Sequence, residues 1–182
     1  EGLLLDVATG GELYVALRAG VPASRCVMHG NNKSLDELRM ALAEGVRQIN
    51  VDSFDELDRL ETLRGEGLPR AKIQLRITPG VHAHTHEYIA TGQDDSKFGF
   101  NLANGDAARA VQRAQGSAAV ELVGLHGHIG SNVFAAESFG RAAEVMATFA
   151  APLGLPELTL GGGLGVAYVT GEQAPSLTRW GE

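Results

Sequence analysis

The sequence predicts an α/β protein in which six βα units form part of an eight-stranded (β/α)8 barrel, the TIM barrel. Three observations predict it. Short apolar runs alternate with helical patterns along the 182 residues, most connections are short, and polar residues follow nearly every expected strand. Strict alternation of strands and helices implies a parallel sheet. Six such units suit either a doubly wound sheet or part of a barrel, and the third observation favours the barrel.

The expected strands are short apolar runs, which is typical of strands buried in a parallel sheet. Glycine or polar residues follow most of them and mark where each strand ends. The runs lie at residues 3–7, 25–29, 48–51, 72–77, 120–125 and 158–160.

The expected helices show apolar residues at helical spacing and, in two cases, a start signal. Ser34 with Glu37 and Ser53 with Glu56 both match the capping box, in which a serine and a glutamate three positions later satisfy each other's backbone N–H groups. The connection from 78 to 104 is the one long loop. The helices are expected at residues 12–19, 35–44, 54–64, 107–115 and 135–150.

Polar residues at the strand ends favour the barrel over the doubly wound sheet. All six histidines lie at or just after the ends of expected strands, and Asp6 and Asp52 do the same. In a barrel, every such end opens onto one face, where the active site lies. In an open sheet, only the point where the strand order reverses gathers chemistry.

The composition of the chain argues against two kinds of binding partner. The net charge of -7 argues against a nucleic-acid partner, because phosphate contacts need a basic surface. No apolar run approaches the roughly 20 residues that a membrane-spanning helix needs. A single cysteine, Cys26, excludes an internal disulfide and is typical of a protein of the reducing cytoplasm. We therefore expect a cytoplasmic protein that binds neither nucleic acid nor a membrane.

Two glycine-containing segments indicate anion binding. Gly161, Gly162 and Gly163 follow the last expected strand, where glycine lets backbone N–H groups approach a phosphate. Ser131, after Gly130, offers a hydroxyl for a second phosphate contact. The alternative for the glycines is a tight turn that needs positive φ.

His126 and His128 point to the same side of their strand, because side chains alternate along a strand. They are candidates for the site, and the alternative is a pair of core histidines. Asp6 and Arg76 are further candidates, because a strand-end carboxylate and an arginine could pair across a barrel. A purely structural role for these two is equally compatible with the sequence.

A second histidine cluster leaves another class of enzyme open. His82, His84 and His86 alternate in the long loop and, read together with His126 and His128, would suit a metal-dependent hydrolase. That class usually has its first H-x-H pair on the opening strand and also needs a late aspartate. A solvated loop is the simpler alternative.

The motifs together resemble the pyridoxal-phosphate-dependent amino-acid decarboxylases, whose barrel is of the alanine-racemase type. Five segments match in order and span nearly the whole chain. Gly127 stands where the family often has serine, and Asn132 where it often has glutamine. The matching segments are LDVATGGEL at 5–13, HGNNK at 29–33, SKFG at 96–99, GLHGHIGS at 124–131 and GGGLG at 161–165.

The resemblance implies pyridoxal 5'-phosphate as cofactor and assigns roles to the candidates. His128 would stack on the cofactor ring, and Ser131 with Gly161, Gly162 and Gly163 would hold its phosphate. Asp6 and Arg76 would support the ring and the surroundings of the cofactor lysine.

The loop at 84–92 is similar to that of family members acting on meso-2,6-diaminopimelate, which implies decarboxylation to L-lysine and CO2. Members acting on ornithine, arginine or carboxynorspermidine are the alternative. The segment from His82 to Lys97 is expected to cover the site and to help choose the substrate, since long loops in compact domains are usually functional.

The resemblance also implies that residues 1–182 are an incomplete barrel domain. It places the cofactor lysine on a strand before Glu1. It places the carboxylate for the ring nitrogen after Glu182, with a β-rich domain that completes the site in a homodimer. Lys33 and Lys97 are the lysines expected in loops at the catalytic face, whereas Lys72 begins a strand at the opposite face. We expect residues 1–182 alone not to decarboxylate amino acids.

Overall fold

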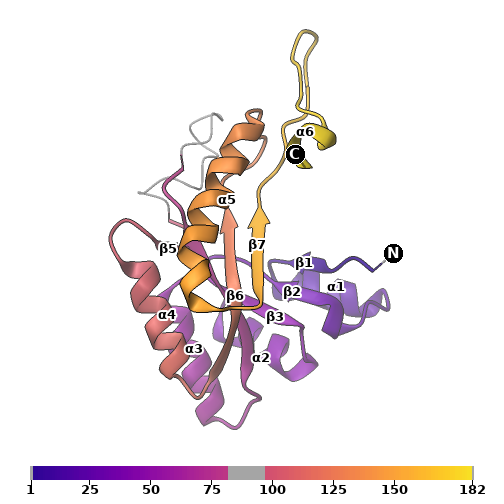
Figure 1. Ribbon diagram of the computed structural model, residues 1–182. Coiled ribbons are helices and arrows are strands. Elements are labelled where there is room, and N and C mark those ends of the chain that lie inside the picture. Colours follow the sequence, from indigo (N-terminus) through magenta and orange to yellow (C-terminus); the bar gives the residue numbers. More distant parts are fainter. Residues whose placement is uncertain (1, 82–96, 182) are drawn as a thin grey trace. The chain divides into compact units, whose positions relative to one another are not determined.

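The computed structural model describes residues 2–81 and 97–181. Figure 1 shows helices and strands that alternate along the chain. The elements are β1 (Leu5–Val7), α1 (Gly10–Arg18), β2 (Cys26–Met28), α2 (Leu35–Glu44), β3 (Gln48–Val51), α3 (Phe54–Gly65), β4 (Ala71–Thr78), β5 (Phe100–Asn101), α4 (Asp106–Gly116), β6 (Val120–His128), α5 (Ala136–Ala150), β7 (Glu157–Gly161) and α6 (Leu177–Gly181).

The strands form a sheet whose order follows the chain. Strand β1 pairs with β2, β2 with β3 and β3 with β4, all in parallel, and the path continues to β6 and β7. The two-residue strand β5 pairs with the end of β4 and lies off this path. A doubly wound sheet reverses its strand order at one point, whereas a barrel wall advances in one direction. The progressive order confirms the partial barrel.

The chain divides into two compact units. Unit 1 comprises Glu1–Leu75 with Ala108–Gly124, and unit 2 comprises Arg76–Ala107 with Leu125–Glu182. Strands β4 and β6 pass from one unit into the other, so that their first residues belong to unit 1 and their carboxyl ends to unit 2.

Unit 1 has a core between its sheet and helices α1, α2, α3 and α4. Leucines from the helices meet β-branched and aliphatic residues from the strands, and each such side chain contributes roughly 1.5–3 kcal/mol when fully buried. Arg113 on α4 donates to Glu61 on α3 at 2.9 Å and also pairs with Asp58, which joins these two helices at the surface. The most completely buried side chains include Leu13, Leu38, Ile49, Leu57, Leu60, Leu63, Ile73 and Leu75.

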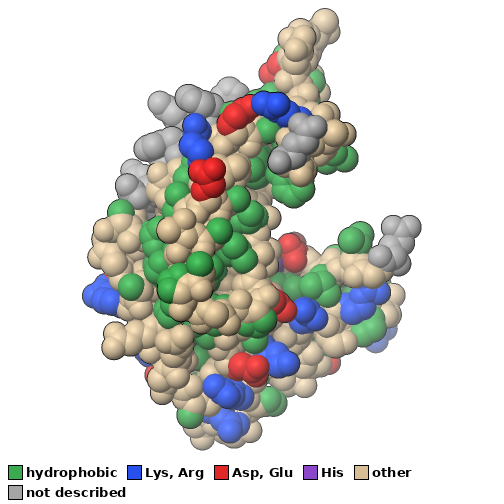
Figure 2. All heavy atoms as spheres, viewed as in Figure 1, with side chains coloured by type: hydrophobic (Ala, Val, Ile, Leu, Met, Phe, Trp, Pro, Cys, Tyr) green, Lys and Arg blue, Asp and Glu red, His purple; other side chains and the backbone are tan. Residues whose placement is uncertain are grey.

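Unit 2 has a smaller core beneath helix α5. Phe139 and Ala142 of α5 pack with Ile129 and Val133, which follow β6, and with Val81, which follows β4. Figure 2 shows hydrophobic side chains gathered along α5. This packing holds the segment after β6 in place, and that segment carries several of the candidate site residues.

The helix starts show where local sequence rules succeed and fail. Ser34 forms the complete capping box with Glu37, as expected. Ser53 also accepts the N–H of Glu56, but the Glu56 carboxylate accepts the N–H of Asp52 at 2.6 Å instead of that of Ser53. The second capping box is therefore wrong, because a buried partner of Glu56, Lys33, competes for its carboxylate.

Other differences are small. Strand β6 runs three residues further than expected, to His128, so both histidines of this segment lie on the strand itself. The short elements β5 and α6 are additional to the sequence prediction. His82, His84 and His86, and most of the expected cover loop up to Lys97, lie outside the residues that the structure describes. No helix in the described part is long and apolar enough to cross a membrane.

Candidate functional site

The strand ends of unit 1 bring three polar side chains together. Asp6 lies on β1, His29 directly after β2 and Asn50 on β3. The backbone N–H of His29 donates to the carbonyl of Val7 at 2.7 Å, and the His29 Nε2 atom lies 3.3 Å from Asp6 Oδ1. Asp6 and Glu12 also line an open pocket of about 640 Å³ beside α1. The carboxyl ends of these strands therefore hold a carboxylate–imidazole pair.

Asn50 fixes the imidazole of His29 from a second direction. Its Nδ2 atom is 3.2 Å from both ring nitrogens of His29. Because the two ring nitrogens are equally distant, the amide nitrogen lies over the ring and not in line with either nitrogen. His29 is thereby held between Asp6 and Asn50.

Lys33 contacts the backbone of Asn50 and is the largest fully buried side chain among the residues described. Its Nζ atom donates to the carbonyls of Gly30 at 2.5 Å and Asn50 at 2.8 Å, and pairs with Glu56 Oε1 at 2.8 Å. Burial raises the pKa of Glu56, and the nearby ammonium of Lys33 opposes that rise. As the sequence predicts, Lys33 lies in the loop between β2 and α2. Its ammonium, however, is buried against these three oxygen atoms and is not open to the catalytic face.

In unit 2, His126 and His128 lie on β6 beside the first glycine of the GGGLG segment. The two imidazole centroids are 6.4 Å apart, with His126 buried and His128 half-buried. A Cβ atom added to Gly161 would lie 3.2 Å from both His126 Nε2 and His128 Nδ1. Gly161 therefore provides the space that these two rings occupy.

Two loops after β6 and β7 are hydrogen-bonded to each other. The N–H of Gly163 donates to the carbonyl of Gly130 at 2.9 Å, and Val133 N–H donates to the carbonyl of Gly163 at 2.8 Å. Asn132, at a left-handed φ of 55°, accepts the N–H of Val166 through its side chain at 3.1 Å. Ser131 is exposed on this joined pair of loops.

The chemistry of these loops fits a phosphate group. They combine glycine backbone, which permits close approach, with an exposed serine hydroxyl at the ends of parallel strands. The N–H of Gly163 is already bonded to Gly130, so in this arrangement Gly163 joins the loops. The assignment of Ser131 and Gly161 to Gly163 as phosphate contacts stays a prediction.

Replacing Gly162 by alanine is expected to destabilise the protein by more than the same change at Gly171. Both glycines have positive φ, 138° and 99°, so both variants carry backbone strain of about 1 kcal/mol or more. Only at Gly162 would the new Cβ meet a neighbour, Phe139 Cε1 at 2.8 Å, whereas nothing lies within 4 Å at Gly171. The contact should add about 1–3 kcal/mol. Urea unfolding of the two variants measures this difference, and equal destabilisation would contradict it.

Arg76 and Asp6 lie in different units, and their expected pairing stays a prediction. The guanidinium of Arg76, on β4, lies 4.4 Å from the ring centroid of Phe98, and the ammonium of Lys97 lies 5.2 Å from the same ring. Arg76 is half-buried. Both cations therefore face an aromatic ring at the carboxyl end of β4.

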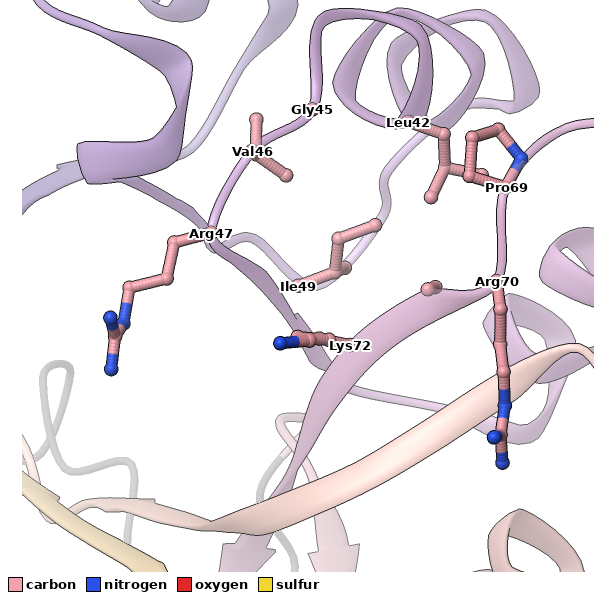
Figure 3. A pocket seen from close by; sticks show the side chains of 9 residues that line it. Leu42, Gly45, Val46, Arg47, Ile49, Pro69, Arg70 and Lys72 are labelled. Carbon is pink, nitrogen blue, oxygen red and sulfur yellow. The ribbon is translucent and has the colours of Figure 1, made fainter.

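Lys72 lies at the opposite end of the strands. Figure 3 shows it with Arg70 and Ile49 around a pocket of about 210 Å³ where β3 and β4 begin. This position agrees with the expectation that Lys72 is remote from the catalytic face. Among residues 2–81 and 97–181, no group of three or more His, Cys, Asp or Glu side chains could hold a metal ion.

Comparison with known proteins identifies the class. The model of the pyridoxal-binding domain of pyridoxal-dependent decarboxylases matches residues 1–180. The chain belongs to this family, whose cofactor is pyridoxal phosphate. The resemblance deduced from the five motifs is thus confirmed, and family membership favours the cofactor-dependent decarboxylase over the metal-dependent hydrolase.

Within this family, the chain is similar to diaminopimelate decarboxylases. The chain is 46% identical to the diaminopimelate decarboxylase of Bacillus subtilis over 100% of its own length and 43% of that protein. It is 44% identical to the enzyme of Mycobacterium tuberculosis, covering 97% of the chain and 42% of the relative. The chain therefore spans less than half the length of the curated relatives it matches.

Solved structures support the same fold. Diaminopimelate decarboxylase from Helicobacter pylori, complexed with L-lysine, aligns with a TM-score of 0.85 at 35% identity, over 96% of this chain and 45% of that one. The enzyme from M. jannaschii gives the same TM-score and identity, over 96% and 42%. An arginine decarboxylase from Paramecium bursaria Chlorella virus aligns with a TM-score of 0.72 at 25% identity, over 94% and 44%. Diaminopimelate decarboxylases and an arginine decarboxylase therefore share the fold of this chain.

Sequence reasoning missed the interior of the unit 1 site. Asn50 and Glu56 were not candidates, although they hold His29 and Lys33. The one available signal was the Ser53–Glu56 spacing, and it indicates a helix cap equally well.

Proposed function

We propose that the protein containing this chain decarboxylates meso-2,6-diaminopimelate to L-lysine and CO2 with pyridoxal phosphate. One observation carries the proposal. Relatives matching at 44–49% identity are diaminopimelate decarboxylases, whereas the arginine decarboxylase of the same fold is 25% identical. Homologous structures complexed with L-lysine, the product of this reaction, support the same substrate class.

The residues of this chain would bind and orient the cofactor. The bound cofactor supplies a ring that accepts the electron pair left when CO2 departs. His128, half-buried at the end of β6, presents a flat imidazole to that ring. Ser131 and the loop from Gly161 to Gly163 hold the phosphate. Asp6 and Arg76 support the ring and its surroundings from the ends of β1 and β4.

The location and assembly of the whole protein are also proposals. One cysteine, Cys26, buried and unpaired by any disulfide, suits the cytoplasm. The resemblance supports a homodimer whose subunits complete each other's sites. Light scattering of the full-length protein is expected to give twice the subunit mass, and a monomer that is fully active would contradict the shared site.

The substrate proposal is tested with purified full-length protein. CO2 release is measured from meso-diaminopimelate, L-ornithine and L-arginine at equal concentrations, before and after bound pyridoxal phosphate is removed from the protein. Of the three amino acids, we expect only diaminopimelate to release CO2, and we expect removal of the cofactor to abolish that release. Faster release from ornithine or arginine would overturn the substrate, and release that persists after cofactor removal would overturn the cofactor chemistry.

A further inference from the structure

We propose that Lys33 is a positioning residue, whose buried ammonium holds the strand ends of unit 1 so that His29 orients the carboxylate of Asp6. The role of Asp6 at the cofactor rests on the proposed function. The geometry of Lys33, Asn50 and His29 is independent of it.

The first step is the set of groups that Lys33 joins. The groups that contact its ammonium come from three segments: Gly30 from the loop after β2, Asn50 from β3 and Glu56 from α3. Lys33 donates hydrogen bonds to the first two, through their backbone carbonyls, and forms an ion pair with the third. The Lys33 side chain has 0% exposure and that of Glu56 1%. The ion pair is therefore shielded from water and holds one fixed geometry.

The second step connects this ion pair to the end of β1. Gly30 has a φ of 105°, and a Cβ added there would lie 2.9 Å from the carbonyl oxygen of Ala8. The loop after β2 thus lies directly against the loop after β1. By binding the carbonyl of Gly30, Lys33 keeps that loop in contact with the segment that follows Asp6.

The third step leads from Asn50 to the imidazole. The carbonyl of Asn50 accepts from Lys33, while its side-chain amide lies over the ring of His29. His29 is also held through its own N–H, bonded to Val7, and it precedes Gly30 directly. Lys33 therefore acts on His29 from both sides, through Gly30 and through Asn50.

The last step concerns Asp6. Its side chain is 74% exposed, and His29 Nε2 at 3.3 Å is a neighbour that is itself fixed. A contact this exposed contributes little to stability, so orientation of the carboxylate is the effect expected of it. A buried ion pair can often be replaced by apolar residues without loss of stability. A variant that lacks the pair but stays folded can therefore show whether His29 keeps its position without it.

The experiment uses full-length protein labelled with 15N-histidine and freed of cofactor. The imidazole signals are recorded for wild type, for Lys33→Met/Glu56→Gln and for the control Leu60→Ala, which opens a cavity one turn beyond Glu56 on α3 and removes no charged or hydrogen-bonding group. His29→Gln assigns the signal. We expect the His29 signal to shift in the double variant and to stay in place in the control.

Asn50→Ala provides a second, milder variant, because it removes the amide over His29 and leaves the Asn50 carbonyl bound to Lys33. It should shift the same signal. With cofactor and diaminopimelate, turnover in the double variant should fall about 10- to 100-fold, as small misplacements at a site do. Leu60→Ala should retain near wild-type turnover.

An unchanged His29 signal in both network variants would overturn the inference, as would an equal shift in Leu60→Ala. A wild-type protein that releases no CO2 from diaminopimelate would instead overturn the proposed function. The histidine spectra would then still decide whether Lys33 positions His29.

Discussion

His128→Ala in the full-length protein is expected to lower the decarboxylation rate on the order of 100-fold, because the cofactor ring loses the flat group that orients it. His128 lies half-buried at the carboxyl end of β6, next to the loop that carries Ser131. Its neighbour His126 is 3% exposed and belongs to the packed interior. The two histidines share a strand and a side, but one of them is accessible and the other is not.

His126→Ala is the matched control. It should reduce stability by about 1–3 kcal/mol, as loss of a buried side chain does, with a smaller effect on turnover. His128→Phe keeps a flat ring and should recover part of the activity lost in His128→Ala. Turnover and thermal unfolding of the three variants separate orientation from packing. If His128→Ala matched the wild-type rate, its stacking role would be refuted.

Local sequence patterns were sufficient for most of the fold. Helix α2 and strand β3 have the predicted bounds, 35–44 and 48–51, because a serine cap, a helical period and a short apolar run are all local signals. The choice of a barrel depended on polar residues at successive strand ends. The progressive strand order agrees with it, since such an order brings those ends to one face.

The interior of the candidate site depended on contacts between residues distant in sequence. Glu56 was expected to cap its own helix, but Lys33, 23 residues earlier, is its partner. Lys33 lies in a loop, as predicted, but its side chain is buried and contacts Glu56 and Asn50. A local pattern cannot distinguish these outcomes, because the deciding term is the cost of burying an unpaired charge.

That cost underlies the expected effect of Lys33→Met in the full-length protein. Methionine has a similar length and is apolar, so packing is largely retained while the charge partner of Glu56 is lost. Breaking a buried ion pair by removing one partner typically costs about 3–5 kcal/mol, because the remaining charge is buried without compensation. Urea unfolding at pH 7.5 should show a loss of that size, and Lys33→Met/Glu56→Gln should recover most of it.

The loss in Lys33→Met should also depend on pH, with a sign that the burial of Glu56 determines. Burial raises the pKa of Glu56 above its ordinary value of 4.5, and removing Lys33 takes away the ammonium that opposes the rise. The folded protein then binds a proton more readily than the unfolded chain. Its stability is therefore retained below pH 4.5 and falls as the pH rises through the folded-state pKa. The difference in unfolding free energy between Lys33→Met and wild type should shrink from pH 7.5 toward pH 5. The double variant, in which Glu56 is replaced by an amide that does not titrate, should show no such trend. A deficit of equal size at both pH values would mean that Glu56 is not the buried charge that Lys33 compensates.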